Sequence, residues 1–234
     1  MTLLTICQAV ADRVGLERPS AVLASTDKNV RQLLALANAE GASLATRHDW
    51  DALVDEHTFL TVAQAEQTNT PVPTDLRKFI PDSFYNRTTQ RKVEGPITPQ
   101  EWQLFQARSV LSTVYLTFRQ RQGTFLMTPV PPANETIAYE YISTGWAQSS
   151  AGQGKTSFTS DDDTSFLSEE LITLGMIWRF KQAKGIEYAE DMETYERALM
   201  TAAGEDGGST ALSMGGNYRG DLMNPSLPEG SFGL

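Results

Sequence analysis

The sequence holds very little of the chemistry that small active sites usually need. Its 234 residues include one cysteine, Cys7, and two histidines, His48 and His57. A single cysteine allows no intramolecular disulfide and cannot supply a zinc ribbon. Cys7 lies on the apolar face of an expected helix with no basic residue nearby, so we expect a small buried side chain rather than a nucleophile. The spacing of the two histidines matches no common zinc site.

Long hydrophobic runs and an excess of positive charge are also missing. No apolar run reaches the length of about 18 residues that a membrane span needs, so we expect no membrane association. No secretory signal opens the chain, which predicts a protein that is made and kept in a cytoplasm, or one that is carried out only inside a larger particle. The formal net charge is −10, from 19 Lys and Arg against 29 Asp and Glu. That balance disfavours wrapping DNA and fits a surface along which DNA can pass.

Motifs for catalysis are incomplete wherever they begin. Residues 154–156 read Gly-Lys-Thr, like the end of a P-loop, but Ser149 stands where the motif requires its first glycine and no helix is expected to follow. The acidic run Asp161–Asp163 lacks EF-hand spacing, and capping of the following helix explains it better. No serine lies in a Gly-x-Ser-x-Gly turn. We therefore predict no enzymatic activity and no catalytic, cofactor-binding or metal-binding residue.

Four amphipathic helices are predicted near the two ends of the chain. Apolar residues recur at helical spacing from residue 2 to 14, and Gly15 is a natural end for that helix. A second helix begins after the capping residues 25–27 and continues to about residue 45. A third runs from Leu167 to Gly185, is apolar on several sides, and is therefore expected to be buried. The fourth carries Met192, Tyr195 and Leu199 on its apolar face and ends near residue 204.

The middle of the chain changes to a strand pattern. Five strands are predicted, at residues 57–62, 76–85, 113–118, 125–128 and 136–142, and the last three are expected to form an antiparallel meander. The segment 100–107 is ambiguous between helix and strand. Residues 143–163 are polar and rich in Gly and Ser, which predicts a flexible surface loop.

These patterns together predict an α+β protein with three parts. Residues 1–50 and 164–205 form a helical bundle from both chain ends, residues 51–163 an inserted antiparallel β-rich domain, and residues 206–234 an extended C-terminal arm. The arm is too rich in glycine to fold alone, so it is either a plain disordered tail or a segment that orders on a partner. Its spaced apolar residues would be the contacts in the second case: Leu212, Met214, Tyr218, Leu222, Met223 and Phe232.

The order of these features resembles that of the head-to-tail adaptor proteins of tailed bacteriophages, including the tail tubular protein A family. The resemblance rests on the residues Pro-Thr-Asp-Leu-Arg-Lys-Phe at 73–79, Trp102, the expected hairpin at 113–129 and the Tyr-x-Tyr strand at 139–141. It continues through the acidic run into Phe166-Leu167 and the helix around Ile177-Trp178. It covers roughly residues 1–205.

The resemblance implies a structural role in the virion. Members of this family form a ring of twelve copies under the portal vertex, with the helical bundle built from both chain ends and the β-rich insertion facing the tail. Their C-terminal arms reach onto the portal protein, which would make the six apolar arm residues portal contacts. The ring extends the DNA channel without binding DNA specifically and presents a platform for the next tail or nozzle protein. Assembly would take place in the host cytoplasm.

Two other interpretations remain open at this point. The first is a phage-encoded hydrolase acting in assembly or lysis, with acids such as Asp49, Asp51 and Asp161 as candidates. The absence of a paired catalytic set argues against it. The second is a neck or tail-completion protein of a long-tailed phage, which has a similar role and a different partner.

Overall fold

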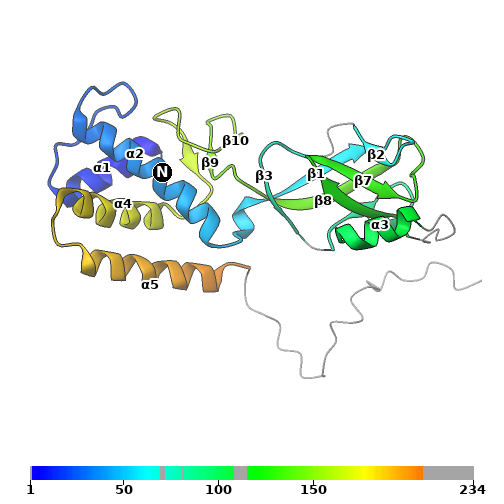
Figure 1. Ribbon diagram of the computed structural model, residues 1–234. Coiled ribbons are helices and arrows are strands. Elements are labelled where there is room, and N and C mark those ends of the chain that lie inside the picture. Colours follow the sequence, from blue (N-terminus) through cyan, green and yellow to red (C-terminus); the bar gives the residue numbers. More distant parts are fainter. Residues whose placement is uncertain (1, 69–71, 81, 108–114, 208–234) are drawn as a thin grey trace, which may run out of the picture.

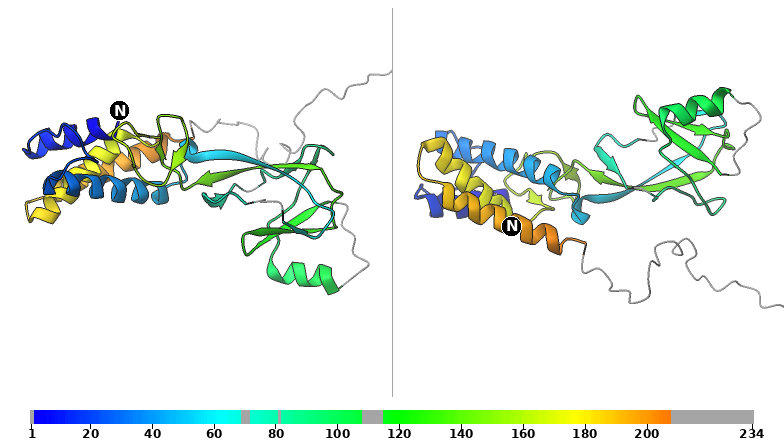
Figure 2. Two further views of the ribbon diagram at one scale, coloured as in Figure 1. Left: turned by 90° about the horizontal axis from the view of Figure 1, so that it is seen from above. Right: turned by 60° about the horizontal axis from the view of Figure 1, so that its bottom comes forward.

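The protein is elongated, with helices at one end and strands at the other (Figures 1 and 2). The structure, a computed structural model, describes residues 2–68, 72–80, 82–107 and 115–207. Within these ranges it contains five α-helices and three antiparallel sheets, which confirms the prediction of an α+β protein. We call residues 2–53 and 144–207 the helical end, and the described part of 54–143 the sheet end.

The four predicted helices are present with nearly the predicted limits. They are α1 (Leu3–Val14), α2 (Lys28–Arg47), α4 (Glu169–Lys184) and α5 (Ala189–Glu205). The side chains of Thr2, Asp27 and Ser168 accept backbone N–H hydrogen bonds at the starts of α1, α2 and α4. Gly15 and Gly185 end α1 and α4 in the left-handed conformation, with φ of 73° and 69°.

One hydrophobic core joins these helices, with α4 at its centre. Helix α4 contacts α1, α2 and α5. It buries eight residues, whereas α5 buries only Tyr195 and Leu199. Helices α1 and α4 run away from the sheet end, and α2 and α5 run toward it (Figure 1). Helices from both ends of the sequence therefore share one apolar interior.

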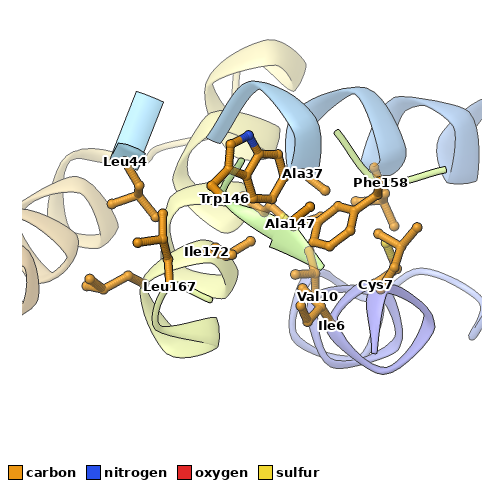
Figure 3. Close-up of a cluster of buried hydrophobic side chains, with 14 of the residues drawn as sticks. Ile6, Cys7, Val10, Ala37, Leu44, Trp146, Ala147, Phe158, Leu167 and Ile172 are labelled. Carbon is orange, nitrogen blue, oxygen red and sulfur yellow. The ribbon is translucent and has the colours of Figure 1, made fainter. Parts of the chain in front are cut away.

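Residues 143–163, which we predicted to be a flexible surface loop, place three side chains in this core, those of Trp146, Ala147 and Phe158. Trp146 and Phe158 are buried and meet edge to face with their rings 4.8 Å apart, next to Val10 and Ala37 (Figure 3). The absence of a side chain at Gly41 makes room for Trp146, because a β-carbon there would lie 2.2 Å from the indole. The segment also forms short strands β9 (Ala147–Gln148) and β10 (Gly154–Lys155), which pair with β11 (Thr164–Ser165) as β10-β9-β11. The loop prediction was wrong, because two large aromatic side chains outweigh the local turn composition.

The helical core consequently crosses the boundary that we placed between residues 163 and 164. Ala147 and Phe158 belong to the same buried cluster as Leu167 and Ile172 of the C-terminal helical region. The division of the chain into a bundle, an inserted domain and an arm stays a prediction.

The main sheet is built around the long strand β8 (Thr136–Ser143). Strand β8 pairs antiparallel with β1 (Val54–Leu60) from Val54↔Ile142 to Leu60↔Thr136. It also pairs with β3 (Leu76–Phe79) and β4 (Tyr85–Asn86), and β4 pairs with β5 (Arg91–Lys92). The single strand predicted over 76–85 is thus two strands, and Pro81, the expected bend, lies outside the described residues.

The second sheet of the sheet end has the order β2-β7-β6. Its strands are β2 (Glu66–Gln67), β6 (Thr117–Arg121) and β7 (Thr124–Thr128). Strands β6 and β7 form a hairpin at the predicted turn, where Gln122 and Gly123 both have positive φ. The first strand begins later than the predicted range 113–118, of which residues 113 and 114 lie outside the described residues. The predicted meander is wrong, because β2 takes the other edge of β7 while β8 belongs to the main sheet. The ambiguous segment is a helix, α3 (Pro99–Ala107).

Aromatic rings fill the space between the two sheets. Phe84 stacks on Tyr139 and on Phe118, with ring centroids 4.4 and 3.9 Å apart. Phe59 and Phe125 complete a separate buried cluster that shares no residue with the helical core. The elongated chain therefore has two hydrophobic cores, one at each end.

Candidate functional site

The most enclosed ionic group of the described residues joins three helices. Glu40 of α2 is fully buried, and its carboxylate accepts hydrogen bonds from Arg179 of α4 and from the hydroxyl of Tyr195 of α5. Burial and the neighbouring Glu40 both raise the pKa of Tyr195, so the phenol stays protonated as a donor. Gly175 leaves the space for the glutamate, because a β-carbon there would lie 2.3 Å from its carboxyl carbon. This arrangement fixes the helices and presents no reactive group to solvent.

Our sequence reasoning did not single out this cluster. Glu40 falls on the apolar stripe of α2, between Ala37 and Leu44, where an acid must find a partner. A charged residue in an apolar stripe was the signal that could have identified it. Its partners Arg179 and Tyr195 lie too far along the chain for spacing to reveal them.

The Gly-Lys-Thr segment forms part of strand β10, and its lysine is already bound. Lys155 Nζ donates to both carboxylate oxygens of Asp163, at 2.9 and 3.0 Å, and to the hydroxyl of Thr159 at 2.7 Å. Asp163 is buried and also accepts from the backbone N–H groups of Thr159 and Ser160. Burial raises the pKa of Asp163, but these hydrogen bonds outweigh it and the net pKa is lowered. The segment does not form a phosphate-binding loop at a helix N-terminus.

The acidic run caps a different helix from the one we predicted. The helix that follows it, α4, begins at Glu169 and is capped by Ser168, so the acidic run lies too far upstream to cap it. The backbone carbonyls of Asp163 and Asp161 instead accept from the first N–H groups of α1, at 2.8 Å from Leu3 and 3.2 Å from Leu4. The first turn of α1 is therefore capped by backbone carbonyl groups of the acidic run, which lies far from α1 in the sequence.

The three acids considered for a hydrolase have separate partners. Asp49 pairs with Arg77 and Lys78 of β3. The Asp161 carboxylate accepts the backbone N–H groups of Val22 and Leu23, at 3.1 and 2.9 Å. Asp51 lies in the short turn before β1, where its own N–H donates to Asp206. The three acids are thus engaged with different elements, and no pair of them shares a hydrogen-bonding partner in the described ranges.

The histidines and the cysteine are also held separately. His48 Nε2 lies 3.1 Å from Asp206, just past the end of α5. His57 in β1 packs against the ring of Tyr139. Cys7 is buried in the helical core, and burial raises the pKa of its thiol to about 12, far from that of a reactive cysteine. Among the residues that the structure describes, no three His, Cys, Asp or Glu side chains gather as metal ligands.

A groove of about 290 Å3 lies where the two ends meet. Asp55 and Asp75 are the ionisable residues of its wall, alongside Ser143, Gly154 and Phe166. Asp75 is already engaged, because its carboxylate accepts from the hydroxyls of Ser143 and Tyr141. Among the described residues, the lining holds no lysine, histidine or cysteine beside these two acids. The groove lies at the junction of the two ends, and one of its two acids is held by hydroxyl groups.

The six predicted arm contacts, Leu212, Met214, Tyr218, Leu222, Met223 and Phe232, lie outside the described residues. The described chain ends at Gly207, next to Asp206, which is bonded to His48 and to the backbone of Asp51. The arm therefore begins at the junction of the two ends. In the described part, no helix combines the length and apolar character that a membrane crossing requires.

Comparison with known proteins supports a structural role. None of the curated proteins matches the chain significantly. The family model described as SU10 adaptor protein matches residues 1–219, which includes both ends of the molecule and the first part of the arm. The chain therefore belongs to the SU10 adaptor protein family, a family of bacteriophage head-tail adaptors.

Proposed function

We propose that copies of this chain form a ring between the portal and the tail of a bacteriophage, and that the ring extends the DNA channel. Twelve copies is the number implied by the resemblance to the tail tubular protein A family. The observation that carries the proposal, beyond the family match, is the pair of separate hydrophobic cores at opposite ends of one elongated chain (Figure 1). Such a chain can bind one partner at each end while both ends stay folded.

The charge of the chain supports the passage of DNA. With a net charge of −10, the protein offers little of the clustered Lys and Arg that hold phosphate groups. A channel wall of the same sign as DNA keeps the polymer from adhering during ejection.

The origin of the arm supports a role in portal binding. The described chain ends at Gly207, at the junction between the two ends, where Asp206 is bonded to His48 and Asp51. Twenty-seven residues, 208 to 234, follow this point. Each apolar contact of such an arm is weak alone, but the arms of a ring bind together through their high effective concentration.

Assembly is tested by measuring mass. Purified protein is mixed with rings of the cognate portal protein, and the complex is examined by native mass spectrometry. We expect the portal mass to increase by a whole-number multiple of 25.8 kDa, with twelve copies the expected number. A mixture in which portal and protein stay separate at micromolar concentration contradicts the proposal.

The arm is tested by truncation after Gly207, which keeps Asp206 and its bonds. We expect unchanged thermal stability and loss of co-sedimentation with portal rings. A full-length control with serine at the six apolar arm positions should lose binding to the same extent. Undiminished binding of both variants would assign portal binding to the folded ends instead.

A further inference from the structure

We propose that the outer face of α2 in one copy packs against the outer face of α5 in the next copy. This inference rests on the proposed ring and names the surfaces through which neighbouring copies bind. Both faces belong to the described helical end, and each is unpartnered in the single chain.

The outer face of α2 is a continuous exposed stripe. Exposed residues recur along it every three or four positions, at Lys28, Arg31, Ala35, Ala39, Ala42 and Thr46. The opposite side of the helix, with Leu33, Ala37 and Leu44, is buried in the core. Small side chains in the middle of the stripe allow close approach of another helix.

The outer face of α5 has the same spacing. Its exposed residues include Glu190, Glu193, Arg197, Met200 and Gly204. Met200 is 72% exposed, the highest value among the exposed large hydrophobic residues of the described chain. A long, flexible apolar side chain in that position gains most by packing against a neighbour.

The two faces carry opposite charge. The outer face of α2 carries two bases, Lys28 and Arg31, whereas Arg47 pairs with Glu196 of α5 in the same copy and the one acid of the helix, Glu40, is buried. The outer face of α5 carries two acids, Glu190 and Glu193, and one base, Arg197, whose Nε lies 3.9 Å from Glu193. Neither Lys28 nor Arg31 forms an ion pair with any residue that the structure describes. An unpaired basic face is unusual on a chain with a net charge of −10, and an acidic helix is its natural partner.

The charges also agree in register. Placing the two helices side by side in the same direction with Lys28 opposite Glu190 puts Arg31 opposite Glu193 and Ala42 opposite Gly204. The same alignment brings Met200 next to Ala39, one of the small residues in the middle of the α2 stripe. One offset thus satisfies the two charge pairs and the apolar contact together.

The orientation of the helices permits this contact between copies. Helices α2 and α5 both run toward the sheet end, and α4 lies between them (Figures 1 and 2). The outer faces therefore point away from α4 on different sides of the molecule. A rotation about an axis along the molecule keeps helix directions alike, so α2 of one copy meets α5 of the next in parallel. Head-to-tail contacts of this kind close into a ring when the rotation from copy to copy adds up to a full turn.

The test is a charge-reversal series in the full-length protein. Arg31→Glu and Glu193→Arg are made singly and together, and ring assembly on portal rings is measured by native mass spectrometry. We expect about tenfold weaker assembly for each single variant, because like charges face each other, and recovery in the double variant. Arg121→Glu, an exposed reversal in β6 at the sheet end, is the matched control and should assemble normally.

A crosslinking experiment makes the test independent of any change in stability. The variant with both Arg31→Cys and Glu193→Cys should give a ladder of disulfide-linked multimers on oxidation of the assembled ring, and each single cysteine variant should not. Normal assembly of both single reversals, with no ladder, overturns the α2–α5 interface and leaves the ring standing. Failure of the unmodified protein to add to the portal overturns the ring and the interface with it.

Discussion

The two ends of the molecule are held together by different chemistry. Of the polar side chains buried in the described residues, both carboxylates, Glu40 and Asp163, lie at the helical end. The sheet end buries only neutral polar groups, such as Gln67 and Asn86, and fills its core with stacked aromatic rings. Its ion pairs lie at the surface, as Arg87–Glu56 does with both side chains about half exposed.

The two kinds of core differ in how precisely they fix the positions of the elements that surround them. An aromatic core is stable over a range of small shifts, because apolar contact is largely non-directional. A buried carboxylate is stable only where the surrounding helices bring hydrogen-bond donors within reach. Any other arrangement of the helices leaves the charge unpaired and raises the free energy of the folded state. The helices α2, α4 and α5 are thus fixed in one relative position, which is what the proposed contact between neighbouring copies would need.

The largest effect is expected from breaking the buried ion pair. Arg179→Met keeps most of the side-chain volume and leaves Glu40 buried without its cationic partner. We expect a loss of about 3–5 kcal/mol in the free energy of unfolding, measured by urea titration. The double variant Arg179→Met with Glu40→Met removes the stranded charge and should recover part of that loss. A single variant within 1 kcal/mol of the unmodified protein would show that the cluster does not hold the helices.

Glycine substitutions in the helices test the same end through packing. An exposed glycine in a helix gains up to about 1 kcal/mol on replacement by alanine. At Gly41 the added carbon would lie 2.2 Å from Trp146, so we expect Gly41→Ala to destabilise by about 1–3 kcal/mol instead. Gly204→Ala in α5 is the control, because nothing lies within 4 Å of its added carbon, and it should be neutral or stabilising. Equal effects at the two positions would show that Trp146 does not pack against Gly41.

The sequence predicts features that depend on neighbouring residues well, and features that depend on distant residues poorly. The helices were predicted well because caps such as Asp27 and stops such as Gly185 act within one turn. Strand partners were not, because the pairing of β8 with β1 joins segments some eighty residues apart and leaves no local trace. The burial of Trp146 was missed for a related reason, since its pocket is supplied by Gly41 of a distant helix.

The same contrast between local and distant signals applies to the candidate site residues. Lys155 of the incomplete P-loop pattern and Asp49 of the candidate acids each have an ion-pair partner that lies outside the motif and could not be read from spacing. The Glu40 cluster depends on three helices, so spacing could mark Glu40 as an acid in an apolar stripe but could not identify Arg179 and Tyr195 as its partners. The arm residues lie outside the described ranges, so their role stays a prediction.

Lowering the pH should destabilise the helical end, because it protonates Asp163. Its pKa is lowered in the folded protein, so its contribution to stability is present above the pKa of the unfolded chain, near 4, and is lost as the pH falls through the folded value. We expect the slope of unfolding free energy against pH below about 4 to flatten in Asp163→Asn. Urea titrations at several pH values measure this slope. Glu56→Gln at the sheet end serves as the comparison and should leave it nearly unchanged, because that carboxylate is about half exposed. Identical slopes in the unmodified protein and Asp163→Asn would mean that the Lys155 pair contributes nothing.

The smallest effect is expected at the surface pair of the sheet end. Arg87 and Glu56 bridge β1 and the turn after β4, but their side chains are 53% and 48% exposed. Water already solvates both charges well, and holding two long side chains in one geometry costs conformational entropy. We therefore expect Arg87→Met to change the free energy of unfolding by less than about 1 kcal/mol. The substitution matches Arg179→Met at the helical end, so the two variants compare one chemical change in two environments. If Arg87→Met were as damaging as Arg179→Met, the contrast between an ionic helical core and an aromatic sheet core would fail, and exposed charges would have to be counted among the forces that fold the sheet end.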